Sequence, residues 1–506
     1  MENMKLMNLL PCLTLIAAMP VPAGHLRAED PAHAGPQTVD ADYRHATEES
    51  IERWRDLKFG MRIIWGTYST LGVEASWPVA EAAPEFQKTY LTQYQVFNPT
   101  DFDAAEWAAD AERWGFKYFI FLTKHHDGFC MYPTKTKMLA YRRKPGSRTS
   151  YNGRMPIITE PVEMHYDIMD TQFKHDIVGE LATAFRKRNL AVGLYYSNVD
   201  WADPNFRWDP LNIHYQKGEQ YGPATHPTEW KAFVERQREQ IREICSNYGE
   251  VVEISFDGSW PEAAWNDMIS IIKMARQLQP GALFRNRGTG AYGDYETPEH
   301  WVPTGPDDPR LSMKWEAIEQ IGTDWAWSPQ ANYKPMDWIL NTLIDCVAMG
   351  GNFMVGVSPM PNGKFPKETT DRLDWTAKWL KVNGECIYGS RPVTVLKGDS
   401  IAASPDLKTA YAADQKKGIR YTRSKDWKRV WAIAKTWPGE ALTVQTLRAK
   451  AGSKVRLLGT KANLAWSQDT RGLTIRIPAR YQDPQNRPCE CAWVFRLEPE
   501  TVKLTN

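Results

Sequence analysis

The feature that most constrains the fold of this 506-residue chain is a unit repeated between residues 100 and 290. Each unit contains an amphipathic helix, a short turn, an apolar strand and a cluster of polar residues. In the first unit, apolar residues at helical spacing occupy residues 104–114, and an apolar strand at residues 117–123 leads into the polar run 124–127. Helices that alternate with short apolar strands predict a parallel sheet whose polar clusters meet at one rim.

The later units repeat this order. Their helices are at residues 177–188, 230–244 and 268–274, and their strands are at residues 191–194, 251–256 and 282–284. The arrangement is typical of a (β/α)₈ barrel of the TIM type, in which active sites lie at the C-terminal ends of the strands. A doubly wound open sheet is the competing fold, but no glycine-rich phosphate loop follows any of these strands. We therefore predict an α/β fold built on a (β/α)₈ barrel.

A change of pattern near residue 390 marks a second domain. Helical periodicity disappears there, and short alternating runs predict antiparallel strands. The runs are residues 429–435, 454–458, 473–477 and 492–497. We expect a (β/α)₈ catalytic domain at residues 40–388 and an all-β C-terminal β-sandwich at residues 389–506. Few polar groups converge on the strands of the sandwich, so we expect it to have a structural role.

The N-terminal segment has the pattern of a signal peptide. A short charged stretch precedes an apolar run at residues 6–23, which Pro11, Pro20 and Pro22 interrupt. A membrane-spanning helix needs about 20 uninterrupted apolar residues, which neither this run nor any later segment provides. The sequence therefore predicts a signal peptide at residues 1–28 and export to the periplasm or the medium, with no membrane span.

Charge and cysteine content exclude several classes of function. The formal net charge is +1, and acidic and basic residues are mixed along the chain, so neither nucleic acid nor an anionic membrane surface is an expected partner. The cysteines after the predicted signal peptide lack the paired spacing of a structural zinc site, so we expect no metal. No motif indicates a cofactor either, and the sequence leaves the oligomeric state open.

A candidate catalytic carboxylate, Asp257, follows one of the predicted strands and precedes Gly258. A carboxylate at this position projects onto the rim, where it can act as a nucleophile or a general base, or simply cap the next loop. Glycoside hydrolysis needs a second carboxyl group, because one group attacks the anomeric carbon while the other protonates the departing oxygen. Asp294, Glu296 and Glu299 lie on the next rim loop and are alternative partners.

An ordered series of motifs resembles the α-L-fucosidases, the retaining enzymes of glycoside hydrolase family 29. Residues 58–69, KFGMRIIWGTYS, are similar to the KFGxFxHWGxYS opening of that family. Its later landmarks follow in order as KHHDGF at residues 124–129, GLYYS at 193–197, FDG at 256–258, TPE at 297–299, KWE at 314–316 and GGN at 350–352. The resemblance covers roughly residues 50–390 and implies a barrel followed by a β-sandwich.

The resemblance also implies a double-displacement mechanism and roles for individual residues. Asp257 matches the nucleophile and Glu299 the acid/base, with Glu296 as the alternative on the same loop. Arg287 would hold Glu299 or the sugar. Because Glu299 must carry a proton near neutral pH to act as the acid, we expect burial or a nearby carboxylate to raise its pKa. The remaining substrate contacts implied by the resemblance are His125, His126, Trp65, Trp77 and one of Tyr195 or Tyr196.

The chain departs from the family pattern in the expected sugar pocket. Arg62 replaces an aromatic residue of the opening motif, and Ser255 replaces the tryptophan two residues before the nucleophile. In the family these aromatics surround the C6 methyl group of fucose, whereas a methyl would leave a buried guanidinium without a partner. A hydroxyl or an anion such as sulfate suits Arg62 better, because a planar guanidinium binds an oxyanion through charge-assisted hydrogen bonds. Further departures are Ile64 in place of a histidine ligand and Ser76-Trp77 in place of a Glu-Trp pair, with Glu74 displaced.

These departures lead to a specific hypothesis about the substrate, an oligosaccharide or polysaccharide. L-Fucose is 6-deoxy-L-galactose, so L-galactose is the sugar with the same ring stereochemistry and a polar C6. We predict a secreted, retaining exo-α-L-glycosidase that cleaves terminal α-L-galactosyl residues with a polar or sulfated C6, as in a porphyran-like galactan. An ordinary α-L-fucosidase, with Arg62 turned outward to pair with an acid, is one alternative. A catalytically inactive sugar-binding protein is another, although the presence of both Asp257 and Glu299 disfavours it.

Overall fold

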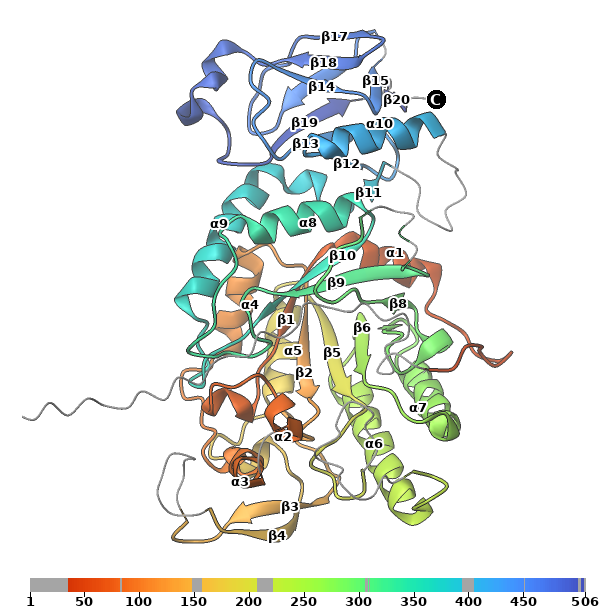
Figure 1. Ribbon diagram of the computed structural model, residues 1–506, viewed down its shortest axis with the longest axis vertical. Helices are drawn as coiled ribbons and strands as arrows, with labels where there is room; N and C mark the ends of the chain where they lie inside the picture. The colour runs from red at the N-terminus through yellow and green to blue at the C-terminus, as the bar shows by residue number, and fades with distance from the viewer. Residues whose placement is uncertain are drawn as a thin grey trace, which may run out of the picture.

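The computed structural model describes residues 35–81, 84–147, 157–206, 222–304, 308, 310–393, 405–449, 451–498 and 502–504. The signal peptide predicted at residues 1–28 lies outside the described residues. Among the residues that are described, no helix has both the length and the apolar character needed to cross a membrane. The chain forms a barrel domain followed by a C-terminal β domain (Figure 1).

The centre of the first domain is an eight-stranded parallel barrel. Its strands are β1 (Phe59–Ile63), β2 (Tyr118–Lys124), β5 (Ala191–Ser197), β6 (Glu253–Asp257), β7 (Leu283–Phe284), β8 (Tyr295–Glu296), β9 (Lys314–Gln320) and β10 (Asn352–Val357). They pair in the order β7-β6-β5-β2-β1-β10-β9-β8. The ring closes beside β7 and β8, where the amide of Asn286 donates to the carbonyl of Tyr295 over 2.9 Å. The predicted (β/α)₈ barrel is confirmed.

Amphipathic helices surround the barrel, because each buries one apolar face against the strands. In α4 (Ala104–Arg113) the buried residues recur at helical spacing, and Asp103 caps the first turn by accepting hydrogen bonds from two backbone amides. The other helices are α1 (Glu48–Leu57), α5 (Ile177–Lys187), α6 (Pro227–Asn247), α7 (Trp265–Leu278), α8 (Trp338–Ala348) and α9 (Lys367–Asn383). Strands β1, β2, β6 and β10 are buried along their whole length, as a parallel sheet covered by helices requires.

The C-terminal ends of the barrel strands form a rim at the end of the barrel away from the C-terminal domain, as the arrowheads of β2 and β5 show (Figure 1). Short elements lie near this end, namely α2 (Trp77–Glu81), α3 (Pro84–Leu91) and the antiparallel hairpin of β3 (Met138–Arg143) and β4 (Thr159–Met164). The polar residues that follow the strands gather at the rim, which is where barrel enzymes place their catalytic groups.

The C-terminal domain contains antiparallel sheets of five, three and two strands. Its strands are β11 (Arg391–Pro392), β12 (Ile419–Arg423), β13 (Val430–Ala434), β14 (Ala441–Val444), β15 (Leu447–Ala449), β16 (Lys454–Leu457), β17 (Trp466–Asp469), β18 (Gly472–Arg476), β19 (Trp493–Glu498) and β20 (Val502–Leu504). Helix α10 (Pro405–Lys416) is additional to the expected strands; its weak apolar pattern leaves only Ala410 and Tyr411 buried and apolar among its described side chains. The indole of Trp379 on α9 donates to the carbonyl of Ala492 at 2.9 Å, which ties this domain to the barrel.

Candidate active site

Asp257 is the last residue of β6, and its carboxylate contacts groups from neighbouring strand ends. Its Oδ2 accepts a hydrogen bond from the hydroxyl of Tyr195 at 2.8 Å, and its Oδ1 accepts one from the amide of Gly258 at 3.0 Å. Gly258 has a φ of 81°, and a Cβ there would lie 2.4 Å from a side-chain carbon of Val199, so the position requires glycine. The strand end and this turn together fix the direction of the carboxylate.

Glu299 lies on the segment that follows β8 and reaches the same place. The Nη1 atom of Arg287 is 3.2 Å from Oδ1 of Asp257, and its Nη2 atom is 2.9 Å from Oε2 of Glu299. One guanidinium therefore bridges the two carboxylates. The structure brings together the carboxylate pair expected from the sequence, with the arginine expected to hold Glu299 between them.

The other acidic residues of this loop point elsewhere. Glu296 accepts a hydrogen bond from the amide of Ser312 at 2.6 Å. Asp294 is paired with Arg276 over 2.5 Å. Of the three carboxylates left open by the sequence, the structure places Glu299 beside the nucleophile candidate.

Arg285 is a site residue that the sequence analysis does not single out. It is fully buried; its Nη2 atom lies 2.8 Å from Oε1 of Glu299, and its Nη1 atom lies 3.8 Å from Oδ2 of Asp257. Its Nε donates to Oγ1 of Thr297 at 2.6 Å, which fixes the guanidinium. Residues two apart on an extended segment share a face, and this alternation between Arg285 and Arg287 is the signal that could have identified it.

The two arginines set the charge of both carboxylates. Burial opposes ionisation of Asp257, but the charges of Arg287 and Arg285 outweigh burial and hold the pKa of Asp257 well below its usual range. For Glu299 the same opposition of burial to Arg287 and Arg285 lowers the pKa to about 2. The expectation of a raised pKa for Glu299 is therefore wrong for the free protein, because both guanidinium groups stabilise its ionised form.

His125 and His126 follow β2 and are both neutral near pH 7. Burial lowers the pKa of His126 to about 4 and that of His125 well below its ordinary value. Nδ1 of His125 is hydrogen-bonded to the hydroxyl of Ser76, and Nδ1 of His126 lies 2.6 Å from the hydroxyl of Ser197. Trp77 packs edge-on against His126, with ring centroids 5.6 Å apart. Because each Nδ1 is engaged, Nε2 is the atom of each ring that can meet a sugar hydroxyl.

A metal centre was not expected from the sequence. Across the described ranges, no group of three or more His, Cys, Asp or Glu side chains is placed to hold a metal ion. Asp127, which is adjacent to His125 and His126, accepts a hydrogen bond from the hydroxyl of Tyr90 at 2.7 Å.

Two residues expected to contact substrate are not brought to the carboxylate pair. The hydroxyl of Tyr196 donates to Oε1 of Gln240 on α6 at 2.7 Å, because successive residues of β5 alternate between the inside and the outside of the barrel. Tyr195 is therefore the tyrosine that faces the site. Trp65 packs against Trp107 of α4, with ring centroids 5.2 Å apart. Tyr196 and Trp65 support the wall of the barrel.

Arg62, on β1, points into the site. Its Nη1 atom lies 3.8 Å from Oε1 of Glu299, and its guanidinium carbon lies 5.2 Å and 5.4 Å from the ring centroids of Tyr195 and Trp325. The residue is 4% exposed, yet its Nε and Nη1 atoms have no hydrogen-bond partner in the part of the chain that the structure describes. The outward orientation considered as an alternative for Arg62 is not the one observed. Buried donors of this kind are costly unless a ligand supplies acceptors.

Two further departures from the family pattern support these arginines. Ser255 accepts a hydrogen bond from Nη1 of Arg285 at 3.4 Å. Glu74 accepts one from the amide of Trp325 at 2.9 Å, and burial raises the pKa of Glu74 to about 7. Glu74 therefore holds the tryptophan whose ring flanks Arg62.

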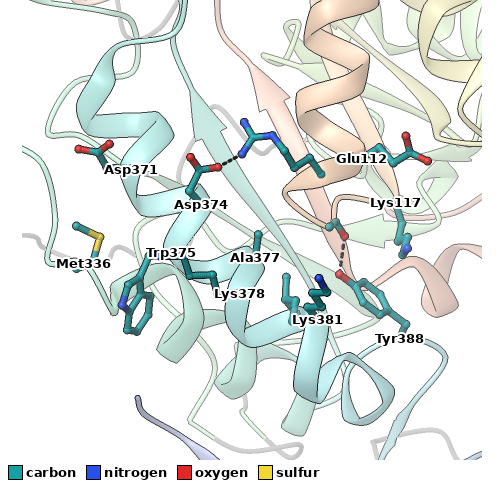
Figure 2. Close-up of a pocket in the computed structure, with 13 residues that line it drawn as sticks. Glu112, Lys117, Met336, Asp371, Asp374, Trp375, Ala377, Lys378, Lys381 and Tyr388 are labelled. Carbon is teal, nitrogen blue, oxygen red and sulfur yellow. Dashed lines mark hydrogen bonds and ion pairs between the residues drawn. The ribbon is translucent and has the colours of Figure 1, made fainter. Parts of the chain in front are cut away.

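A groove of about 820 Å³ on the outer wall of the barrel, along α9, is separate from this cluster (Figure 2). Its lining includes Lys117, Trp375 and Tyr388 and none of the arginines or carboxylates described above. Its Asp374 is paired with Arg113, as the dashed line in Figure 2 shows. The groove does not hold a pair of free carboxylates, so the chemistry is assigned to the rim.

Comparison with known proteins identifies relatives over both domains. The sequence matches the family model described as α-L-fucosidase over residues 28–147 and 160–385, and the model described as the α-L-fucosidase C-terminal domain over residues 413–498. The chain is 25% identical to human tissue α-L-fucosidase over 493 residues, which cover 91% of this chain and 92% of that protein. It is 27% identical to rat plasma α-L-fucosidase over 492 residues, which cover 89% and 93%.

Solved structures agree with the fold. An α-L-fucosidase of glycoside hydrolase family 29 from Bacteroides thetaiotaomicron superposes with a TM-score of 0.71 at 24% identity, covering 92% of this chain and 98% of that one. A covalent intermediate of an enzyme from the same organism, trapped with 2-fluoro-fucosyl fluoride, has a TM-score of 0.69 at 23% identity, with coverages of 92% and 98%. At these identities the likeness establishes the barrel and the C-terminal β domain.

Proposed function

Because the chain belongs to the α-L-fucosidase family of glycoside hydrolases, we propose that it is a retaining exo-glycosidase that removes terminal α-L-sugars from an oligosaccharide or polysaccharide. The observation that carries this proposal is the bridge that Arg287 makes between Asp257 and Glu299. A retaining glycosidase needs two carboxyl groups close together, one to attack the sugar and one to transfer the proton.

In the first step, Asp257 attacks the anomeric carbon. Its depressed pKa keeps it ionised, and the Tyr195 hydroxyl holds Oδ2 at 2.8 Å in a fixed direction. A bond forms between a carboxylate oxygen of Asp257 and C1 as the bond from C1 to the leaving oxygen breaks. The protonated form of Glu299 gives its proton to that oxygen, so the leaving group departs as an alcohol.

In the second step, water replaces the enzyme on the sugar. The carboxylate of Glu299 takes a proton from the water molecule whose oxygen attacks C1, and the bond between C1 and Asp257 breaks. Two inversions at C1 give net retention. The neutral rings of His125 and His126 supply Nε2 atoms that can bind ring hydroxyls without adding charge.

The substituent at C6 is the next part of the proposal. We place it against Arg62 and propose that it is a hydroxyl or, with greater complementarity, an anion such as sulfate. The support is the buried guanidinium of Arg62, whose Nε and Nη1 lack partners among the described residues. The surroundings also favour an anion, because the guanidinium groups of Arg62, Arg285 and Arg287 all lie within 4 Å of Asp257 or Glu299 and concentrate positive charge there.

These features favour α-L-galactosides, and 6-sulfated α-L-galactosides above all, as in a porphyran-like galactan. A fucoside would place a methyl group where Arg62 needs acceptors, so binding it would leave the donors unpaired. An α-L-fucoside nevertheless fits the same ring stereochemistry, and its turnover is the reference against which the preference is measured.

We also propose that the enzyme works outside the cytoplasm. The support is the sequence of residues 1–28, with its apolar run interrupted by prolines. Expression of the full chain in a bacterium, followed by N-terminal sequencing of the protein in the periplasm and the medium, tests this. Recovery of a chain that lacks the first residues agrees with export, and an intact N-terminus in the cytoplasm contradicts it.

The proposed activity is tested with aryl α-L-fucoside, aryl α-L-galactoside and the 6-sulfated aryl α-L-galactoside, with Asp257→Ala as the blank. We expect the highest kcat/KM for the sulfated substrate and the lowest for the fucoside. A preference for the fucoside would show an ordinary α-L-fucosidase and contradict the role of Arg62. Binding of these sugars without turnover of any would show a sugar-binding protein instead.

A further inference from the structure

The proton donor of the proposed reaction is ionised in the free protein. Glu299 lies 2.8 Å from Nη2 of Arg285, 2.9 Å from Nη2 of Arg287 and 3.8 Å from Nη1 of Arg62. The facing negative charge is Asp257, which Arg287 and Arg285 also contact. The arrangement suits the second step, in which Glu299 acts as a base, but it withholds the proton that the first step needs.

Resting on the proposed function, we propose that an anionic group on the substrate completes the acid catalyst: by pairing with Arg62, it allows Glu299 to take up the proton that goes to the leaving group. The substituent is then more than a feature for recognition. It changes the protonation state of Glu299, so binding of an anionic substrate provides the protonated acid that the first step needs.

Arg62 is the arginine of the cluster that can change partner. Arg285 is held by Thr297 at 2.6 Å as well as by Glu299. Arg287 contacts both carboxylates. Arg62 approaches Glu299 only at 3.8 Å, and its Nε and Nη1 have no hydrogen-bond partner among the described residues. A ligand anion can therefore pair with Arg62 without breaking an existing hydrogen bond of that residue.

Electrostatics gives the direction of the effect. Burial and the charge of Asp257 raise the pKa of Glu299, whereas the charges of Arg287, Arg285 and, to a smaller extent, Arg62 lower it. An anion beside Arg62 adds a negative charge near Glu299 and offsets one of the guanidinium charges. This change raises the pKa of Glu299 and so favours uptake of a proton from solvent when the anionic ligand binds.

The change in charge at Asp257 during the reaction also suits the second step. In the first step Glu299 gives its proton to the leaving oxygen, and Asp257 becomes an ester without charge. The loss of this negative charge lowers the pKa of Glu299 again, which favours the carboxylate that accepts a proton from water. Hydrolysis of the ester restores Asp257 and returns the site to its starting charge.

Proton uptake on binding tests the inference directly. L-Galactose 6-sulfate and L-galactose are titrated into the full-length protein near pH 6.5 by calorimetry, in buffers with different ionisation enthalpies. A sulfate monoester stays ionised at this pH, so any proton taken up goes to the protein. We expect net proton uptake for the sulfated sugar and none for L-galactose.

Three variants make the result specific. Glu299→Gln should bind the sulfated sugar without proton uptake, which separates Glu299 from the neutral histidines. Arg62→Gln should abolish the difference in proton uptake between the two sugars. Arg471→Gln removes an exposed arginine of the C-terminal domain, which pairs with Asp469, and should behave as the unchanged protein.

The outcomes distinguish this inference from the proposed function. Preferential binding of the sulfated sugar without proton uptake would overturn the inference and leave the C6 preference intact. Uptake that persists in Glu299→Gln would assign the proton to another group and also overturn it. If the protein bound the sulfated sugar no more tightly than L-galactose, the proposed preference at C6 would be wrong, and the inference would be wrong with it.

Discussion

Asp257 and Glu299 contact the two terminal nitrogens of one guanidinium, at 3.2 Å and 2.9 Å. Arg287 thereby fixes the distance and the mutual orientation of the nucleophile and of the residue that transfers the proton. Arg285 makes a second, looser bridge between the same carboxylates. A site built in this way holds both carboxyl groups before substrate arrives, which lowers the cost of orienting them in the transition state.

The acid/base assignment is checked with Glu299→Gln and its matched control, Glu296→Gln. We expect Glu299→Gln to lower turnover by roughly 10²–10⁴-fold on substrates whose leaving group needs a proton, because general acid catalysis contributes about that much. The leaving group of a dinitrophenyl glycoside departs as a phenolate without protonation. The first step on such substrates should therefore be slowed far less by Glu299→Gln. Glu296 accepts hydrogen bonds from the backbone amides of Ser312 and Met313, which lie away from the carboxylate pair. The Glu296→Gln variant should therefore retain the turnover of the unchanged protein. Equal losses in both variants would contradict the assignment.

The specificity role of Arg62 is checked by Arg62→Met, measured as the ratio of kcat/KM for sulfated and unsulfated α-L-galactosides. A hydrogen bond to a charged group contributes about 1.5–3 kcal/mol, so we expect the ratio to fall roughly 10–100-fold. Arg471→Met, at an exposed arginine, serves as the control for loss of positive charge. A ratio unchanged by Arg62→Met would show that the substituent at C6 binds elsewhere.

The barrel could be predicted because its signals are local and repeated. Apolar residues at helical spacing in α4 and an unbroken apolar strand in β2 are readable from the sequence, and parallel pairing follows from their alternation. The end of β6 likewise marks Asp257 as a rim carboxylate. Helix α10 lacks such a signal, since its described side chains bury only Ala410 and Tyr411 as apolar residues.

The site could be predicted only in part, because the rest depends on three-dimensional contacts. Tyr195 and Tyr196 must face opposite sides of β5, but the sequence does not say which one faces inward. The pKa of Glu299 depends on where Arg285 and Arg62 place their charges, which sequence spacing does not determine. Burial, which the sequence does suggest, raises the pKa of a carboxyl group and is the largest single influence on Glu299, but the charges of the arginines together outweigh it.

The two adjacent tyrosines provide a further prediction. Tyr195→Phe removes a hydrogen bond to the ionised Asp257, and we expect kcat to fall roughly 10–100-fold, since such bonds contribute about 1.5–3 kcal/mol. Tyr196→Phe removes a bond to Gln240 on α6 and should cost about 1 kcal/mol of unfolding free energy with turnover retained. Steady-state kinetics and denaturant unfolding of both variants separate the two roles. The reverse pattern would mean that Tyr196 faces the substrate.

Stability should depend on pH through Glu316, which is buried inside the barrel and accepts a hydrogen bond from Tyr118. Burial raises its pKa from an ordinary value of 4.5 to about 7. Because the folded pKa exceeds the unfolded one, the ionised form is disfavoured in the folded state. The stabilising contribution of protonated Glu316 to the free energy of unfolding is fully present below pH 4.5. It declines by about 3 kcal/mol in all as the pH rises toward about 7.

Glu316→Gln keeps a polar group of similar shape without the titration. Denaturant unfolding between pH 4 and pH 8 should show a flatter pH dependence for this variant than for the unchanged protein. Glu319→Gln, on the same strand, removes a carboxylate that is paired with Lys334 at 2.8 Å and serves as the matched control. Parallel curves for the unchanged protein and Glu316→Gln would show that Glu316 does not change its protonation in this range.

The central claim, a retaining mechanism with Asp257 as the nucleophile, is tested most directly by trapping the covalent intermediate. A 2-deoxy-2-fluoro-L-galactosyl fluoride is incubated with the enzyme, and the intact mass and the peptides are then measured by mass spectrometry. We expect one added fluoroglycosyl group per chain, located on the peptide that contains Asp257 and absent in Asp257→Ala. A label on another residue, or sustained hydrolysis of the reagent by Asp257→Ala, would contradict the mechanism.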